Sequence, residues 1–294
     1  MAYTGLARAG HHMKWSLLVT GIILLAPDCL ADNPFFVTYT AKMEEARSLE
    51  IETRSITGKP GDQNRFGASA VEFEYGTTGW WTSELYLDGQ VTTSESAIYT
   101  GYRVENRFRV RPREHWINPV LYVEFEHLND ADKALLEIVG HDGKADLAGP
   151  NWFARQFWTT ELETKLILDS NFKGWTLAEN LIAERELSAG APWEFGYAVG
   201  VSRALGRGSS RCNFCRGLTA GIEAYGGIGT NQSFGLQNTS HYIGPTLAWE
   251  PEHGPAFKIS PNFGLTSTSA GVLLRIGMSY EIDDFGRQIK NLFR

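Results

Sequence analysis

The sequence predicts an all-β protein, an antiparallel up-and-down transmembrane β-barrel of about twelve strands. First, segments of about ten residues with alternating apolar and polar side chains recur between residues 48 and 282, each bounded by turn residues. Second, no run of 18 apolar residues follows residue 31. A membrane-inserted chain of this kind must therefore close into a barrel to satisfy its backbone hydrogen bonds. Third, tryptophans gather near the segment ends, as they do at membrane interfaces.

The N-terminus predicts a secretory signal peptide over residues 1–31. Lys14 precedes the apolar run 15–26, and the sequence PDCLA then offers a cleavage site after Ala31. Met13 is a natural start, so residues 1–12 are interpreted as a possible upstream extension. A lipoprotein site at Cys29 and an uncleaved anchor are the alternatives. The cleaved signal peptide and both alternatives predict export to an oxidising compartment. We expect residues 32–47 to form a periplasmic segment before the barrel.

The last predicted strand shows the alternation best. Its apolar face carries Val272, Leu274, Ile276, Met278, Tyr280 and Ile282, while Arg275 and Glu281 fall on the other face. The polar side chains then point into the barrel and the apolar ones toward lipid. The twelve predicted strands lie within 49–57, 68–76, 81–89, 98–110, 120–126, 157–168, 174–187, 192–205, 217–227, 241–250, 256–265 and 271–282.

Connection lengths support an even strand count. With both termini in the periplasm, turns after even strands should be short and loops after odd strands long. Most connections agree, but three do not: 188–191 and 267–271 are short, and 206–217 is long. Residues 134–140 are either a short helix or part of a further hairpin, which would make fourteen strands. We expect residues 283–294 to be a periplasmic tail.

The ionisable side chains of the inner face are the candidate site. A ladder of arginines lies between strands that carry carboxylates, so neighbours of opposite sign should attract across strands. Two interpretations are open: a structural network of salt bridges, or a charge-selective constriction for small solutes. Twelve strands enclose a narrow lumen. The predicted lumen-lining residues are Glu84, Arg103, Arg107, Arg109, Glu124, Glu126, Glu161, Glu163 and Arg275.

Two further motifs carry possible chemistry. Cys212 and Cys215 form a C-x-x-C pair, which favours a local disulfide over metal binding or redox function. His141 stands beside two aspartates in the longest predicted external loop, which is either a catalytic or metal-binding cluster or a solvated loop. Glu72 and Glu74 share one strand face and need no catalytic explanation inside a charged barrel. We expect no catalytic residue, no bound metal and no cofactor.

The final strand resembles the terminal strand of Gram-negative outer-membrane β-barrel proteins, in which alternating apolar or aromatic residues guide insertion. The residues that match are Leu274, Ile276, Met278, Tyr280 and Ile282. The family usually ends on an aromatic residue, whereas this chain continues through DDFGRQIKNLFR. The resemblance implies a location in the bacterial outer membrane, contact with lipid and lipopolysaccharide, and insertion by the outer-membrane assembly machinery.

Together these observations predict a porin-like outer-membrane protein that transports small solutes through a narrow channel. The alternatives are an outer-membrane enzyme that acts on lipid or peptide at the outer rim, and a closed structural or adhesive barrel. A soluble periplasmic β-protein is the remaining rival. The formal net charge of −7 and the lack of a basic stripe argue against a nucleic-acid partner.

Overall fold

The computed structural model describes residues 33–59, 65–95, 97–134, 151–205, 217–251 and 253–292. The predicted signal peptide, the Cys212–Cys215 pair and His141 lie outside the described residues. So does most of the segment 134–140.

Twelve antiparallel strands form a closed barrel, as the alternation predicts. Each strand pairs with its neighbours in sequence, and β1 pairs with β12 to close the sheet. The strands are β1 (Leu49–Gly58), β2 (Phe66–Thr78), β3 (Trp81–Thr92), β4 (Ile98–Arg109), β5 (Asn118–Asn129), β6 (Trp158–Phe172), β7 (Trp175–Glu186), β8 (Glu194–Ala204), β9 (Leu218–Thr230), β10 (His241–Trp249), β11 (Ala256–Gly264) and β12 (Val272–Ile282).

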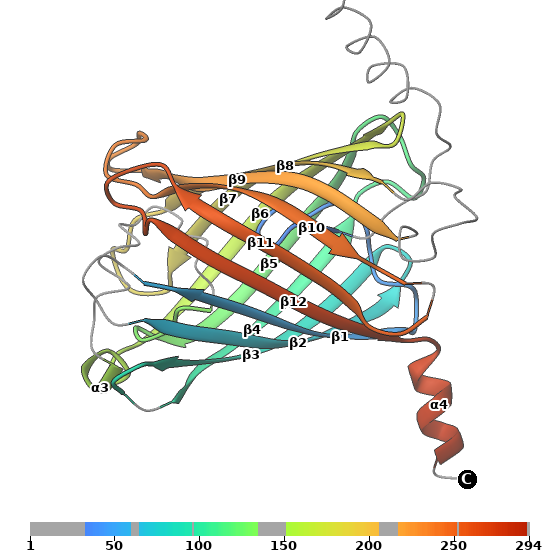
Figure 1. Ribbon diagram of the computed structural model, residues 1–294, viewed down its shortest axis with the longest axis horizontal. Coiled ribbons are helices and arrows are strands. Elements are labelled where there is room, and N and C mark those ends of the chain that lie inside the picture. Colours follow the sequence, from blue (N-terminus) through green and yellow to red (C-terminus); the bar gives the residue numbers. More distant parts are fainter. Residues whose placement is uncertain are drawn as a thin grey trace, which may run out of the picture.

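The two ends of the barrel differ. At one end, here called the turn end, short turns join β2 to β3 and β6 to β7. Lys173 and Gly174 adopt left-handed conformations in the second of these turns, with φ values of 49° and 77°. The helix α4 (Phe285–Leu292) follows β12 at this end, and the short helix α3 (Asn151–Ala154) lies at the opposite, loop end (Figure 1). No helix among the described residues is long and apolar enough to cross a membrane.

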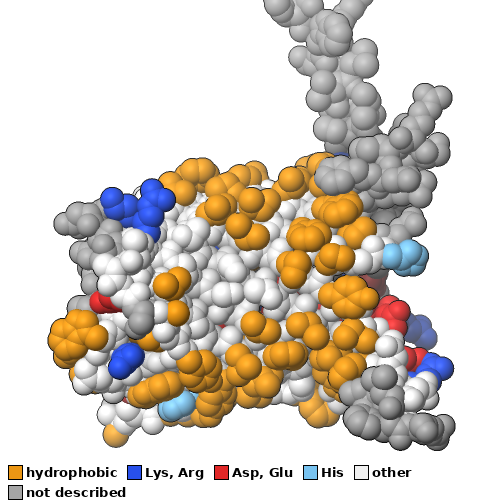
Figure 2. All heavy atoms as spheres, turned by 60° about the horizontal axis from the view of Figure 1, so that its bottom comes forward, with side chains coloured by type: hydrophobic (Ala, Val, Ile, Leu, Met, Phe, Trp, Pro, Cys, Tyr) orange, Lys and Arg blue, Asp and Glu red, His pale blue; other side chains and the backbone are white. Residues whose placement is uncertain are grey.

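The outer surface is apolar around the barrel. Figure 2 shows hydrophobic side chains spread over the wall and charged ones near its two ends. Val123, Phe125 and Leu181 are among the exposed large side chains, and exposed tryptophans such as Trp80 and Trp116 stand at strand ends. Polar and charged side chains of the same strands are buried in the interior. This is the inside-out pattern of a barrel that spans a lipid bilayer.

Residues 33–48, here called the plug, dip into the barrel, and residues 34–41 are buried there. Phe35, Val37 and Tyr39 are at most 3% exposed, and the segment contains no regular secondary structure. This differs from the periplasmic segment that the sequence predicts for residues 32–47. The physical reason is that a twelve-strand barrel is wider than its own side chains can fill. The largely uncharged stretch NPFFVTYTA supplies the missing volume and buries its aromatic rings.

The plug enters and leaves the lumen at the turn end. Its first residue, Asn33, and its later residue Glu44 both line a cavity together with Glu50 and Trp249, which lie at that end of β1 and β10. Its middle residues reach deeper, where Phe36 and Val37 pack with Ile56 and Leu273. The plug is therefore a loop that dips into the lumen from one side and returns.

Candidate functional site

The walls of the lumen hold the plug by its backbone. One carboxylate oxygen of Glu223 on β9 accepts the N–H groups of Phe36, Val37 and Thr38, at 3.2, 3.1 and 3.3 Å. Asn180 on β7 accepts the N–H of Tyr39 at 2.7 Å and donates to its carbonyl oxygen at 2.9 Å. These wall side chains replace the hydrogen bonds that a sheet or helix would give this backbone.

A second set of contacts holds the later half of the plug. The N–H of Ala41 donates to Asp169 at 3.4 Å, and its carbonyl oxygen accepts from Arg109 at 2.9 Å. Arg107 donates to the carbonyl oxygen of Lys42 at 3.1 Å, and Thr82 accepts the N–H of Glu44 at 3.3 Å. The plug is therefore fixed to strands on several sides of the lumen.

Apolar packing accompanies these hydrogen bonds. Phe36 and Val37 belong to one buried cluster, and Tyr39, Ala41 and Met43 belong to another. The Tyr39 ring meets the Tyr122 ring edge-on, with centroids 5.1 Å apart, and its hydroxyl donates to Glu105 at 3.0 Å. The interior thus contains small apolar cores around the plug, which the alternation of the strands alone does not predict.

Backbone contacts hold the junction between the end of the plug and the first strand, β1. Arg47 has a φ of 78°, its N–H donates to the carbonyl oxygen of Gly76 at 2.6 Å, and its own carbonyl oxygen accepts from Phe285 at 3.0 Å. The end of the plug, the β2–β3 turn and the start of α4 therefore meet at one place.

The predicted arginine ladder is present and is fully engaged. Arg103 on β4 contacts Asp88 at 3.1 Å and Glu124 at 2.9 Å. Arg107 donates from Nε to Glu84 at 2.6 Å and also pairs with Glu74 and with Glu105. Arg103 and Arg107 therefore each link carboxylates from neighbouring strands, as the salt-bridge interpretation requires, whereas Arg109 contacts the plug.

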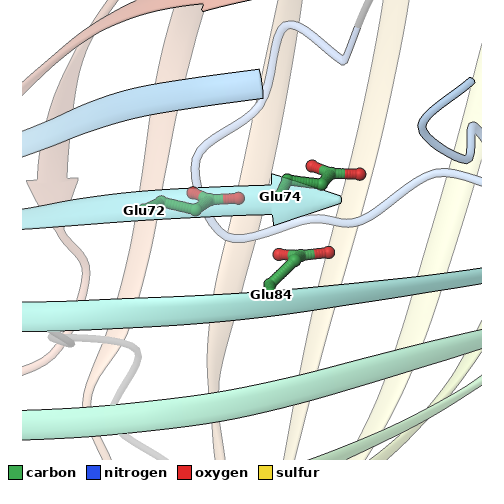
Figure 3. A group of neighbouring side chains, drawn as sticks. All are labelled: Glu72, Glu74 and Glu84. Carbon is green, nitrogen blue, oxygen red and sulfur yellow. The ribbon is translucent and has the colours of Figure 1, made fainter. Parts of the chain in front are cut away.

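Figure 3 shows three carboxylates of this network, with Glu72 and Glu74 from β2 turned toward Glu84 from β3. Their like charges are offset by cations from the wall. Arg54 contacts Glu72 at 2.9 Å, and Arg107 pairs with both other members. Such mutually satisfied ionic groups tolerate burial, whereas unpaired ones do not.

The remaining predicted lumen residues also face inward. Arg275 is buried, with its guanidinium 5.5 Å from the centre of the Tyr225 ring. Glu126 and Glu163 are buried, and Glu161 is half-buried nearer the loop end. Arg109 lies at the turn end against the plug. The structure places all nine predicted residues on the inner face, but it divides them between the arginine ladder, the plug contacts and an acidic group.

Two cavities flank the plug at the turn end. One, of about 70 Å³, lies between the plug and Arg54, Glu74 and Lys258. The other, of about 170 Å³, lies between the plug and Arg109, Asn118 and Asp169. Each is lined by polar side chains and is large enough to hold water.

Sequence reasoning missed Asn180 and Glu223 as functional residues. Asn180 lies on the predicted strand with the least regular alternation, and Ile182 beside it points inward among polar neighbours. Glu223 is the one carboxylate in the otherwise uncharged strand β9. An isolated inward carboxylate without a cation on its own strand was the available signal.

No protein-family model matches this chain. No curated protein sequence matches it significantly either. Solved structures with similar folds include an outer-membrane channel from Pseudomonas putida F1, with 9% identity over 85% of this chain and 99% of that chain and a TM-score of 0.49. LpxR from Salmonella typhimurium gives 10% identity over 79% of this chain and 99% of that chain, with a TM-score of 0.38. The translocator domain of the autotransporter NalP from Neisseria meningitidis gives 12% identity, covers 79% of this chain and 87% of that chain, and has a TM-score of 0.39. The likeness to these structures is one of fold alone.

Proposed function

We propose that the protein resides in the Gram-negative outer membrane and acts as a gated, narrow pore for small solutes. The plug closes the lumen in the state described here. The observation that carries this proposal is that a separate chain segment, packed among inward side chains of the wall, lies in the centre of the barrel. Removing that segment from the lumen would leave a passage lined by charged side chains.

The contacts of the plug favour a movable element. It is joined to the wall at Ser48, and its first described residue lies back at the turn end. Its middle is held by hydrogen bonds to Glu223, Asn180 and Asp169, which water can replace when the plug leaves. The turn end faces the periplasm in this proposal, so a periplasmic event would release the plug.

The charge of the lumen favours cations among small solutes. Acidic side chains outnumber basic ones among the buried residues that the structure describes. A narrow, low-dielectric passage with an excess of one sign concentrates ions of the other sign. We also infer that lipid and lipopolysaccharide surround the apolar wall, and that the outer-membrane assembly machinery inserts the chain.

Conductance in a planar lipid bilayer tests the pore. The unheated, detergent-extracted protein should show rare openings, and a variant with Asn180→Ala and Glu223→Gln should open often because its plug is less strongly held. The reversal potential in a KCl gradient should indicate a preference for K⁺. Density separation of cell membranes tests the location, since the protein should accompany the outer-membrane fraction.

The matched control is Asn262→Ala. Asn262 is also buried on the inner face, but the hydrogen bonds that its amide donates go to Ser260 on its own strand. It should leave the opening frequency unchanged. If the double variant folds, migrates as a compact barrel on an unheated gel and still passes no current, the pore proposal is wrong.

A further inference from the structure

A second group of carboxylates lies in the wall, on β5, β6 and β7. This acidic cluster consists of Glu126, Glu161, Glu163 and Glu184, with Glu124 at its edge. Antiparallel pairing sets Glu126 opposite Glu161, and Glu163 opposite both Glu124 and Glu184. All of these side chains share the inner face. Oxygens of Glu124, Glu126 and Glu163 lie within 4.8 Å of one another, and so do oxygens of Glu126, Glu161 and Glu184.

Glu126 belongs to both groups and is the informative member. The residue is 1% exposed, and neither of its carboxylate oxygens has a hydrogen-bond partner among the residues that the structure describes. Arg103 is its direct cross-strand neighbour, yet the guanidinium of Arg103 is turned to Asp88 and Glu124. A buried carboxylate is therefore directed into a cluster of like charges.

The cations near this cluster are already engaged. Lys165 contacts Glu163 at 3.0 Å and lies 4.5 Å from the centre of the Tyr122 ring. One oxygen of Glu124 binds Arg103 and the other accepts the hydroxyl of Tyr122. The cluster of Glu72, Glu74 and Glu84 in Figure 3 differs in this respect, because Arg54 and Arg107 offset its charge.

We propose that the acidic cluster binds a divalent cation, Ca²⁺, through Glu126, Glu161, Glu184 and one oxygen of Glu163. Ca²⁺ takes six to eight oxygen ligands at about 2.3–2.6 Å, so ligands on opposite sides of the ion lie about 4.6–5.2 Å apart. Within each of the two groups of three carboxylates, the oxygens lie no more than 4.8 Å apart, which is similar to this width. Mg²⁺ prefers one or two carboxylates and retained waters, which fits a four-carboxylate group less well.

The position of the site predicts its effect. Its ligands come from three consecutive strands near the loop end, where β5 runs toward the long β5–β6 connection. A bound ion joins these strands across the wall and removes the repulsion between their carboxylates. Ca²⁺ should therefore raise the temperature at which the barrel unfolds, because a ligand that binds only the folded state stabilises it.

Calcium titration of the full-length protein in detergent at neutral pH tests this site. Isothermal calorimetry with CaCl₂ should show saturable binding with a dissociation constant of about 10⁻⁴–10⁻³ M, the range of extracellular calcium modules. Samples heated to increasing temperatures and then run on a gel should convert from the compact to the unfolded band at a higher temperature with Ca²⁺ than with EDTA. Glu126→Gln should weaken binding at least tenfold and abolish the difference between Ca²⁺ and EDTA.

Two further variants keep the test decisive. Glu161→Gln changes a half-buried ligand and should also weaken binding if Glu126→Gln does not fold. Glu72→Gln is the matched control, since it removes a buried inner-face carboxylate from the compensated cluster and should leave calcium affinity unchanged. No saturable binding up to about 10 mM Ca²⁺, ten times the upper end of that range, would overturn the proposal. Unchanged affinity in a folded Glu126→Gln or Glu161→Gln protein would overturn it too.

Discussion

At the scale of single residues, the plug packs tightly against the wall at Gly200. A Cβ atom built at this position would lie 2.6–2.8 Å from three ring atoms of Phe35. The absence of a side chain on β8 therefore makes room for the plug. Phe35 itself is 1% exposed, so its ring has little space into which to retreat.

The substitution Gly200→Ala should loosen the plug. Overpacking of this kind costs about 1–3 kcal/mol, and the cost falls on the contact between Phe35 and the wall. Denaturant unfolding in detergent should show the loss, and the bilayer recording should show more frequent openings. The control is Gly67→Ala, whose Cβ would lie at an ordinary 3.7 Å from Val91. Equal effects of the two variants would contradict the role assigned to Gly200.

The sequence predicts the direction of a side chain better than its partner. Period-two alternation places Arg103, Glu124 and Glu126 on the inner face, where all three side chains are buried in the structure. It does not predict that Arg103 contacts Asp88 and Glu124 while Glu126 is left without a hydrogen bond among the described residues. A long guanidinium can reach several carboxylates, so the choice depends on distances that a linear pattern does not contain.

At the scale of elements, the plug is an irregular segment whose backbone is satisfied by side chains of the wall. A buried N–H without a partner costs about 1–3 kcal/mol, so the three N–H groups that donate to Glu223 make this carboxylate the main anchor. Because a few wall residues supply most of these hydrogen bonds, substitution of one of them should weaken the binding of the whole plug.

Replacement of Glu223 by Gln should expose the plug backbone to solvent exchange. Hydrogen bonds to a charged acceptor contribute about 1.5–3 kcal/mol, which corresponds to a tenfold or larger change in an opening equilibrium. Hydrogen-exchange mass spectrometry should show faster exchange in peptides from residues 33–48, with the strands unchanged. Glu72→Gln, which removes a carboxylate bound to Arg54, should leave plug exchange as it was. Uniform acceleration across the barrel would instead mean global destabilisation.

The strands were predictable and the plug was not, for a physical reason. Each strand repeats one pattern over about ten residues, and its pairing with sequence neighbours follows from short connections. The plug has no period, and its partners Asn180 and Glu223 are 141 and at least 185 residues away in the chain. Its apolar stretch after the predicted signal peptide was the hint that it would be buried.

At the scale of the whole molecule, the barrel inverts the usual arrangement of a soluble protein. Large apolar side chains are exposed on the outer wall, and carboxylates and guanidiniums are buried within. The aromatic residues at strand ends mark the borders of the apolar zone. In water this surface would favour aggregation, whereas in lipid it lies in its preferred medium.

An arginine on the outer wall tests this inversion. Val123 lies outward in the middle of β5, and Ile117 lies just before its start; both are exposed. In a bilayer, Val123→Arg should cost about 2–4 kcal/mol and Ile117→Arg about 0–1 kcal/mol, because the penalty depends on depth. Denaturant unfolding in lipid vesicles measures the difference. A barrel with a solvated outer wall would tolerate both changes equally, since exposed positions in water usually shift stability by less than about 0.5 kcal/mol. Equal free energies of unfolding for the two variants would therefore contradict insertion of the barrel into a bilayer, and with it the proposed pore.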